Sequence, residues 1–373
     1  MTEVTVGKDM KHADSVDPRR LVRLARESEE RGDTAQSLQL YERAIGALRD
    51  ESDLELLADV LRWKGTLHRE QGETETAFNL YKESLRYAVR CGSVISKAHC
   101  YNCLAIVAQR RGNLNECERL YMHAADLASK AGDIRLLGII EHNRGVLMNM
   151  RGKYPAAEVR YASSLRSFEK VGDDQSVSSV LNNVGILYTK LGHYQRAVET
   201  LGRGLDIARA RNDAVNESIL TLTLAEAWVA AGRLDQAEDA CSLALELARD
   251  RGDHLTMAGA LKCRARIERE RGAFGSSIST LRIGIREAEV LEDRLLQAEM
   301  LRELGETSKA LGNATDARLA WREAAESFEG LDAGHEAAEI NALLASLPAL
   351  KTAPAPVRRR STPPQQDGFS PTL

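Results

Sequence analysis

Glycine recurs every forty residues along nearly the whole chain. The unbroken series is Gly32, Gly72, Gly112, Gly152, Gly192, Gly232, Gly272 and Gly312. Each of these glycines stands between two stretches with helical apolar spacing; residues 181–211, for example, read as two amphipathic helices joined at Gly192. Repetition at a fixed period is the signature of a solenoid. The period therefore predicts one elongated repeat array in place of the two or three globular domains that 373 residues would otherwise suggest.

A second series of helix-ending residues lies twenty positions out of phase: Gly92, Gly132, Gly172, Asn212 and Gly252. Glycine, and less often asparagine, takes the left-handed conformation that ends a helix. Aspartate follows directly at positions 133, 173, 213 and 253, where it can cap the next helix. Helix ends every twenty residues predict helices of equal length arranged in antiparallel hairpins.

Small residues recur at three fixed distances from the turn glycines, seven residues before and five and twelve residues after. The first of these columns is Ala25, Gly65, Ala105, Gly145, Gly185, Ala225, Ala265 and Gly305. Glycine inside a helix costs about 1 kcal/mol relative to alanine, so its recurrence there predicts that helix backbones approach closely.

A column of mostly large residues lies nine positions after the turn glycine: Tyr41, Tyr81, Tyr121, Tyr161, Leu201, Cys241, Leu281 and Trp321. Cys241 is the exception in size. We expect these side chains to fill the space between successive hairpins, because interlocking helices need large residues beside small ones.

These columns resemble those of the tetratricopeptide repeat family, which has small residues at the same three positions, an aromatic at the fourth and a glycine-containing turn. The resemblance covers eight repeats, from about Asp17 to Leu331. The period is forty rather than the usual thirty-four, and the proline that often ends the family's second helix is absent. The chain thus looks like the longer-helix subclass, found in bacterial signalling regulators and in animal scaffolds that bind extended peptides. The resemblance implies an all-α, right-handed α-solenoid of eight helical hairpins.

The organisation we expect has three parts. Residues 1–16 are polar and aperiodic and are predicted to form a disordered lead-in. Residues 17–347 form the solenoid, closed by a C-terminal capping helix whose apolar stripe is Ile340, Leu343, Leu344 and Leu347. Residues 348–373 are rich in Pro, Ser and Arg and are predicted to be a disordered tail. The tail segment Arg358–Pro363 is open to four interpretations: a solvated segment without a partner, a phosphorylation site, a ligand for an acidic surface, or a segment that folds back into the chain's own groove.

The composition limits the classes of partner and the cell compartment that we expect. The net charge of −4 gives no general attraction to nucleic acid, and runs such as Leu136–Ile140 are too short for membrane insertion. The N-terminus has no signal-peptide core, which predicts a cytoplasmic protein with its six cysteines reduced.

In the first helix of each hairpin, the resemblance implies that residues ten, nine, six, three and two before the turn glycine line a concave groove that holds extended peptides. The candidate groove residues are Arg62, Trp63, Arg69, Asn102, Gln109, Arg110, His142, Asn143, Asn149, Asn182, Asn183 and Lys190. Five asparagines on one face are informative, because asparagine is a poor residue inside helices. A ladder of amides can hold a ligand backbone without fixing its sequence.

Alternatives remain for these residues. Instead of binding a ligand, the amides could bridge neighbouring helices or face water. Trp63 is either a ligand anchor or buried by the next repeat. The arginines favour an acidic or carboxylate-bearing partner, whereas Lys262, Arg266 and Arg269 are expected to meet Glu226, Glu270, Glu303 and Glu306.

The sequence offers no catalytic motif and predicts a protein that is not an enzyme and uses no cofactor. Cys100 and Cys103, with His99, Cys91 and Cys117 nearby, suggest a zinc site, but Cys117 lies in a small-residue column, which favours packing. The function predicted is a non-catalytic scaffold or adaptor that binds a protein or peptide. The alternative is a regulator that senses a peptide, changes its superhelical pitch and controls an effector.

Overall fold

The computed structural model describes residues 17–48, 53–291, 293–331 and 333–348. The predicted lead-in and all but the first residue of the predicted tail lie outside this part of the chain. The first helices of the hairpins are α1 (Pro18–Glu30), α3 (Leu54–Glu70), α5 (Val94–Arg110), α7 (Ile134–Met150), α9 (Asp174–Lys190), α11 (Ala214–Ala230), α13 (His254–Glu270) and α15 (Arg294–Ala310). The second helices are α2 (Thr34–Leu48), α4 (Thr74–Arg90), α6 (Leu114–Ala131), α8 (Tyr154–Val171), α10 (Tyr194–Ala210), α12 (Leu234–Arg251), α14 (Phe274–Val290) and α16 (Ala314–Gly330). α17 (Gly334–Ala345) follows, and within the described ranges there is no strand.

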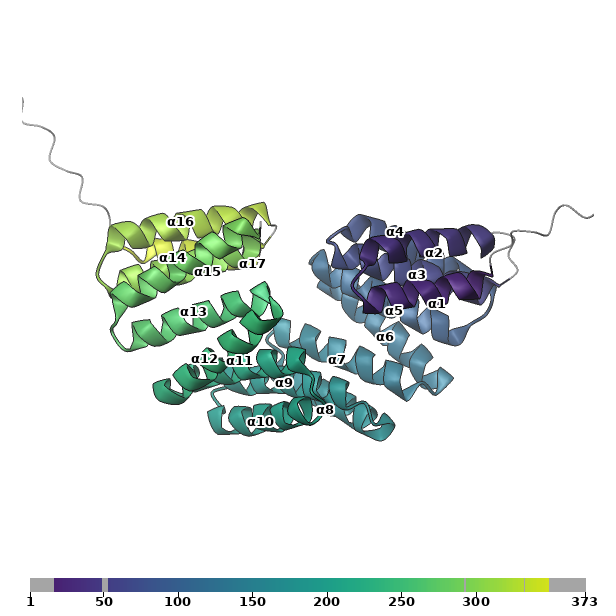
Figure 1. Cartoon of the computed structure of the whole chain (residues 1–373), viewed down its shortest axis with the longest axis horizontal. Helices are drawn as coiled ribbons and strands as arrows, with labels where there is room; N and C mark the ends of the chain where they lie inside the picture. The colour runs from purple at the N-terminus through teal and green to yellow at the C-terminus, as the bar shows by residue number, and fades with distance from the viewer. Residues whose placement is uncertain (1–16, 49–52, 292, 332, 349–373) are drawn as a thin grey trace, which may run out of the picture. The chain divides into compact units, whose positions relative to one another are not determined.

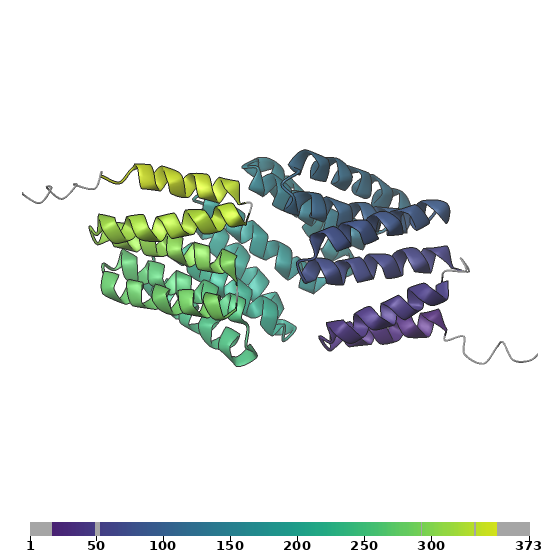
Figure 2. The ribbon, with the colours of Figure 1, turned by 90° about the horizontal axis from the view of Figure 1, so that it is seen from above.

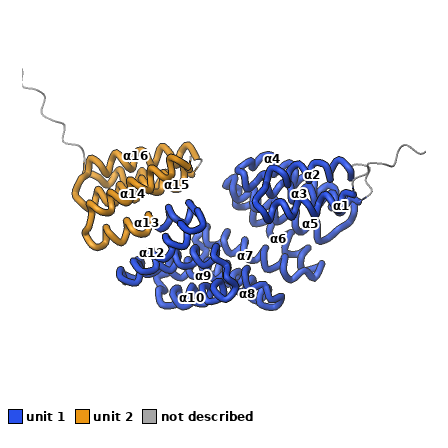
Figure 3. The backbone as a smooth tube through the Cα atoms, in the orientation of Figure 1, with its two compact units in different colours: residues 1–260 blue, residues 261–373 orange. Residues whose placement is uncertain are grey.

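The predicted fold class, an all-α solenoid of eight helical hairpins with a C-terminal helix, is confirmed. The chain divides into unit 1, residues 1–260, and unit 2, residues 261–373 (Figure 3). Within each unit the helices lie side by side as antiparallel rods (Figures 1 and 2). That residues 17–347 form a single domain stays a prediction.

The turn chemistry is as predicted. Gly192, between α9 and α10, has φ of 74°, and the glycines of both turn series share this left-handed conformation. Asn212 takes the equivalent place between α10 and α11 with φ of 52°. The side chain of Asp173 caps α9 by accepting a 3.1 Å hydrogen bond from the backbone N–H of Ser176. Helices therefore end and restart at the residues that the twenty-residue spacing indicates.

The three small-residue columns are buried throughout the described hairpins. A Cβ added to Gly145 of α7 would lie 2.5 Å from the ring of Tyr161 on α8, and one added to Gly65 would lie 2.8 Å from the ring of Tyr81. The large column thus fills space inside its own hairpin. The expected contact with the next hairpin also occurs, since Tyr41 of α2 stacks on Trp63 of α3. The sequence analysis did not foresee that the missing side chain of the first helix makes room for the ring of the second.

α17 packs on α16 as a cap. Ile340 is fully buried, and Leu343 and Leu344 pack against the cluster formed by Trp321 and Phe328 of α16. Arg318 of α16 donates a 2.7 Å hydrogen bond to the carbonyl oxygen of Pro348, which fixes the end of the described chain.

Candidate functional site

The first helices of successive hairpins contact one another directly in unit 1, in the order α3, α5, α7, α9 and α11. Their shared surface, together with α1, is called the first-helix face below. The twelve candidate groove residues come from it. They fall in two tiers: a mid-helix tier, ten and nine residues before each turn glycine, and a C-terminal tier, three and two residues before it.

The mid-helix tier forms a ladder of side-chain hydrogen bonds between neighbouring first helices. Asn143 Nδ2 of α7 donates to Asn102 Oδ1 of α5 at 3.1 Å, across 41 residues of sequence. Asn183 Nδ2 of α9 and His142 Nε2 of α7 lie 2.8 Å apart, again across 41 residues. Asn102 is buried, with 7% of its surface exposed. These four side chains therefore bridge helices, as the alternative interpretation of the amides holds.

The C-terminal tier has cross-links with the same spacing. Arg110 Nη1 of α5 donates to the carbonyl oxygen of Arg69 on α3 at 2.9 Å. Gln109 Nε2 lies 3.1 Å from Met150 Sδ on α7. Each pair spans 41 residues, one repeat plus one position. The extra position has a simple origin. The residue ten or three before the turn glycine faces the next first helix, and the residue nine or two before it faces the preceding one.

Both ladders stop in the same region. Asn182 of α9 would pair with Thr223 of α11, but the Thr223 hydroxyl instead donates to the carbonyl oxygen of Ile219 in its own helix at 3.0 Å. Asn182 Oδ1 is consequently buried without a hydrogen-bond partner. Asn149 Oδ1 of α7 is also buried without one, and Lys190 in the next helix is exposed. Buried polar atoms without partners are rare, so these two oxygens mark a candidate ligand site.

The tyrosines of the large column reach this face with their hydroxyls, which sequence reasoning missed. Tyr41 donates to Glu29 Oε1 at 2.6 Å, and Tyr121 Oη lies 3.5 Å from Gln109 Oε1; each pair is twelve residues apart. Tyr161 stands twelve residues after Asn149, and burial raises its pKa while the Asn149 side chain acts in the opposite direction. The repeated twelve-residue spacing was the available signal.

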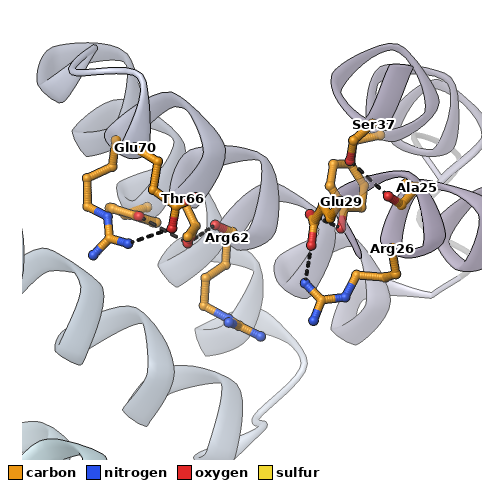
Figure 4. Close-up of polar contacts among 10 residues, drawn as sticks. Ala25, Arg26, Glu29, Ser37, Arg62, Thr66 and Glu70 are labelled. Carbon is orange, nitrogen blue, oxygen red and sulfur yellow. Dashed lines mark hydrogen bonds and ion pairs between the residues drawn. The ribbon is translucent and has the colours of Figure 1, made fainter. Parts of the chain in front are cut away.

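Trp63 is half-buried and already contacts one aromatic and two cationic side chains of the chain. Its ring stacks on Tyr41 with centroids 6.3 Å apart, and the guanidinium carbons of Arg26 and Arg62 lie 5.3 and 5.4 Å from its centroid. A pocket of about 260 Å³ lies beside it, between α1 and α3. Its polar lining includes Glu29, which binds Arg26 at 2.6 Å, and Thr66 (Figure 4). Trp63 is therefore part of a cation–π cluster and not an open aromatic platform.

Two histidines beside the ladder are held neutral. Burial lowers the pKa of His142 to about 4. Burial, with a smaller contribution from Arg62, also lowers the pKa of His99 to about 4. With Asn183 as the donor, neutral His142 accepts through Nε2, so the bond between α7 and α9 forms at neutral pH.

In unit 2 the corresponding helices are joined by ion pairs. Lys262 Nζ of α13 lies 2.5 Å from Glu299 of α15, and Arg269 pairs with Glu303 at 2.8 Å and with Glu270 at 3.8 Å. The expected meeting of Arg269 with Glu270 and Glu303 is confirmed. Lys262 and Arg269 of α13 are thus both paired with carboxylates of the chain.

Cys100 and Cys117, two of the cysteines considered for a zinc site, are buried packing residues. Cys100 Sγ is buried 2.9 Å from Ser84 Oγ, and burial raises the pKa of its thiol to about 12. Cys117 is fully buried in its small-residue column. Among the residues that the structure describes, no group of three His, Cys, Asp or Glu side chains could hold a metal ion. No helix in the described ranges combines the length and apolar character that a membrane span requires.

Two overlapping segments, residues 97–170 and 136–210, match the family model described as "Tetratricopeptide repeat". Residues 185–271 match a model described as "Anaphase-promoting complex subunit 5". No curated protein matches the sequence.

Solved structures share the fold at low identity. The apo form of the quorum sensor NprR from B. thuringiensis is 14% identical, with a TM-score of 0.64 over 86% of this chain and 90% of that one. A Rap protein complexed with Competence and Sporulation Factor is 14% identical, with a TM-score of 0.58 over 89% and 97%. The signal transduction ATPase with a tetratricopeptide repeat sensor from Pyrococcus horikoshii is 17% identical, with a TM-score of 0.61 over 89% of this chain and 49% of that one.

Proposed function

The chain is a tetratricopeptide-repeat protein, and we propose that it binds an extended segment of another protein, or a peptide, on the first-helix face of unit 1. The observation that carries this proposal is the pair of buried, unpartnered oxygens, Asn149 Oδ1 and Asn182 Oδ1, on the neighbouring helices α7 and α9. Every other amide of the two tiers already has a partner in the chain.

An extended segment supplies what these oxygens lack. Its backbone N–H groups have no internal acceptors, and a side-chain amide accepts through its oxygen and donates through its nitrogen. Leaving a buried acceptor unsatisfied costs about 1–3 kcal/mol. A ligand that donates a hydrogen bond to each of the two oxygens removes this cost, which favours binding. The ladder that joins α5, α7 and α9 holds these helices in place, so little ordering is needed on binding.

The protein acts without catalysis, as a scaffold or adaptor. The site contacts mainly the backbone of the ligand. It can therefore bind several ligands whose side chains differ. The net charge of −4 does not favour nucleic acid as the partner, and we place the protein in the cytoplasm.

The test uses random nonapeptides in a display selection against the full-length protein. We expect an enriched peptide set that the Asn149→Ala, Asn182→Ala double variant fails to bind although its melting temperature is no lower than that of the wild type. The control is Asn79→Ala, which removes an exposed amide from α4 and should retain binding. Enriched peptides that bind the double variant as well as the wild type would place the site elsewhere.

A second candidate function is a sensor whose hairpins shift when the ligand binds. The observation that favours it is the ladder itself, because a ligand amide inserted beside Asn182 competes for the His142–Asn183 bond that joins α7 to α9. The quorum sensor NprR has this fold, although the likeness extends to the fold alone. Small-angle scattering with an enriched peptide tests it: a changed scattering profile supports the sensor, and an unchanged one supports the rigid scaffold.

A further inference from the structure

We propose that residues 353–360, which read Ala-Pro-Ala-Pro-Val-Arg-Arg-Arg, bind within the same chain to a groove between α14 and α16 of unit 2. The proposed peptide site lies on the first helices of unit 1, whereas two second helices border this groove. The inference therefore goes beyond the proposed function and does not rest on it. It gives unit 2 an interaction surface and names the segment that covers this surface.

The groove is built by three consecutive helices of unit 2, α14, α15 and α16 (Figure 3). It contains a pocket of about 160 Å³. Leu301 of α15 and Ala320 of α16 line the pocket and are buried, with 6% and 4% of their surface exposed. Ile278 of α14 and Leu319 of α16 line it from opposite helices, and Leu319 keeps 59% of its surface exposed. An apolar segment in the pocket covers Leu319, and removing this apolar surface from water favours binding.

The border of the groove on α16 is acidic. The exposed charged residues along this side of the helix are three carboxylates and one guanidinium: Asp316, Glu323, Glu326 and Arg322. In the described part of the chain, neither Glu323 nor Glu326 forms an ion pair. Arg282 lies across the pocket on α14. Positive charge in a ligand is therefore favoured along α16 and disfavoured along α14.

The segment that follows the described residues has matching chemistry in a matching order. Residues 353–357 carry only small apolar side chains, and Arg358–Arg360 come directly after them. The two prolines of the segment have no N–H, so their burial in an apolar pocket leaves no donor unpaired. Alternating prolines also favour the extended polyproline conformation, which loses little entropy on binding to an apolar groove. In the proposed arrangement Val357 covers Leu319, and the arginines lie beside Glu323.

The chain approaches the groove already attached to α16. Arg318 Nη2 donates a 2.7 Å hydrogen bond to the carbonyl oxygen of Pro348, which follows α17. The Nε of the same guanidinium is buried without a partner, so it is a donor that a carbonyl oxygen of a following residue can satisfy. A helix with its side chains is about 10–12 Å across. About six residues at about 3.1 Å each span about 19 Å, which is enough to pass over α16 and bring Pro354 to the pocket.

The test is disulfide cross-linking in the full-length protein, in a Cys91→Ser background because Cys91 is the exposed cysteine among the described ones. The test pair is Leu319→Cys with Val357→Cys. The control pair is Val159→Cys with Val357→Cys, because Val159 of α8 is 60% exposed and, like Leu319, stands seven residues after its turn glycine. We expect the test pair to form an intrachain disulfide at least tenfold faster than the control pair, at a rate that does not depend on protein concentration.

Charge reversal distinguishes binding from chance collisions of a tethered segment. The variant Arg358→Glu, Arg359→Glu, Arg360→Glu should slow the test pair at least tenfold, because its charges repel the carboxylates of α16. Adding Glu323→Lys and Glu326→Lys to this variant should restore the rate. The substituted positions of α16 are exposed, so each variant is expected to fold, and thermal melting checks this.

Three results would overturn the proposal. An intrachain rate no faster than that of the control pair would leave the groove to a partner other than this segment, and so would a rate that ignores both charge reversals. A disulfide between two chains, formed faster at higher protein concentration, would assign the groove to a second copy of the chain. None of these results bears on Asn149 and Asn182, whose peptides are selected and measured separately.

Discussion

Asn183 Nδ2 lies 2.8 Å from His142 Nε2, while the side-chain oxygen Oδ1 of the adjacent residue, Asn182, is buried with no partner. Two neighbouring asparagines of α9 thus have opposite roles. Asn183 joins its hairpin to the preceding hairpin, whereas Asn182 Oδ1 finds no hydrogen-bond donor in the chain. Asn183 therefore contributes to stability, whereas Asn182 is the residue of the pair that we propose to bind the ligand.

The first prediction contrasts replacements at these two positions. Asn182→Leu removes an unsatisfied acceptor and an unfavourable helix residue, so the free energy of unfolding should rise by about 1 kcal/mol. Asn183→Leu leaves His142 Nε2 without its donor and should lower that free energy by about 1–3 kcal/mol. Urea denaturation of both variants measures the difference. Equal effects of the two changes would show that the amides are energetically equivalent.

The second prediction concerns glycines inside helices. Gly145→Ala places a Cβ 2.5 Å from the Tyr161 ring and should cost about 1–3 kcal/mol through overpacking. Gly202, in the interior of α10, has no atom within 4 Å of the added Cβ. Gly202→Ala should therefore stabilise the protein by about 0.5–1 kcal/mol. Thermal denaturation distinguishes them; destabilisation by both changes would mean that close approach is not what selects glycine at position 145.

Much of the fold could be predicted because repetition multiplies each weak signal. One glycine indicates little, but Gly192 and its seven equivalents define the turns, and Asn212 was identified as a substitute by its place in the series. The small-residue columns predicted close packing, and they are buried. The sizes of the residues did not reveal which side chain lies against each glycine. At Gly145 it is the ring of Tyr161, from the second helix of the same hairpin.

The site could be predicted only as a face. Helical periodicity placed Asn102, Asn143 and Asn183 on one surface, but it does not tell which neighbour each side chain meets. The 41-residue pairing depends on the rotation of one helix against the next, which no single repeat encodes. Asn182 Oδ1 lacks a donor because the Thr223 hydroxyl bonds within its own helix. The sequence alone does not show which of these two bonds the hydroxyl makes.

The third prediction tests the turn conformation. Gly192 has φ of 74°, and Gly192→Ala should cost about 1–2 kcal/mol, because a Cβ is strained in the left-handed region. Asn212 has φ of 52° in the equivalent turn, and Asn212→Gly should change stability by a few tenths of a kcal/mol at most, since both residues accept this conformation. Paired urea titrations are the measurement. A cost at Asn212→Gly as large as that at Gly192→Ala would assign Asn212 a role beyond the turn.

The last prediction concerns acid. His99 and His142 have pKa values of about 4 in the folded chain, against an ordinary value of 6.5. Between pH 6.5 and 4 the unfolded chain binds more protons than the folded chain, so the free energy of unfolding falls as the pH falls. The slope is at most about 1.4 kcal/mol per pH unit for each histidine. Urea denaturation across this range measures the slope, and His142→Gln, whose amide oxygen still accepts from Asn183, should reduce it. The same change at the exposed His254 is the control; a slope that His142→Gln leaves intact would show that His142 is not the group that takes up the proton.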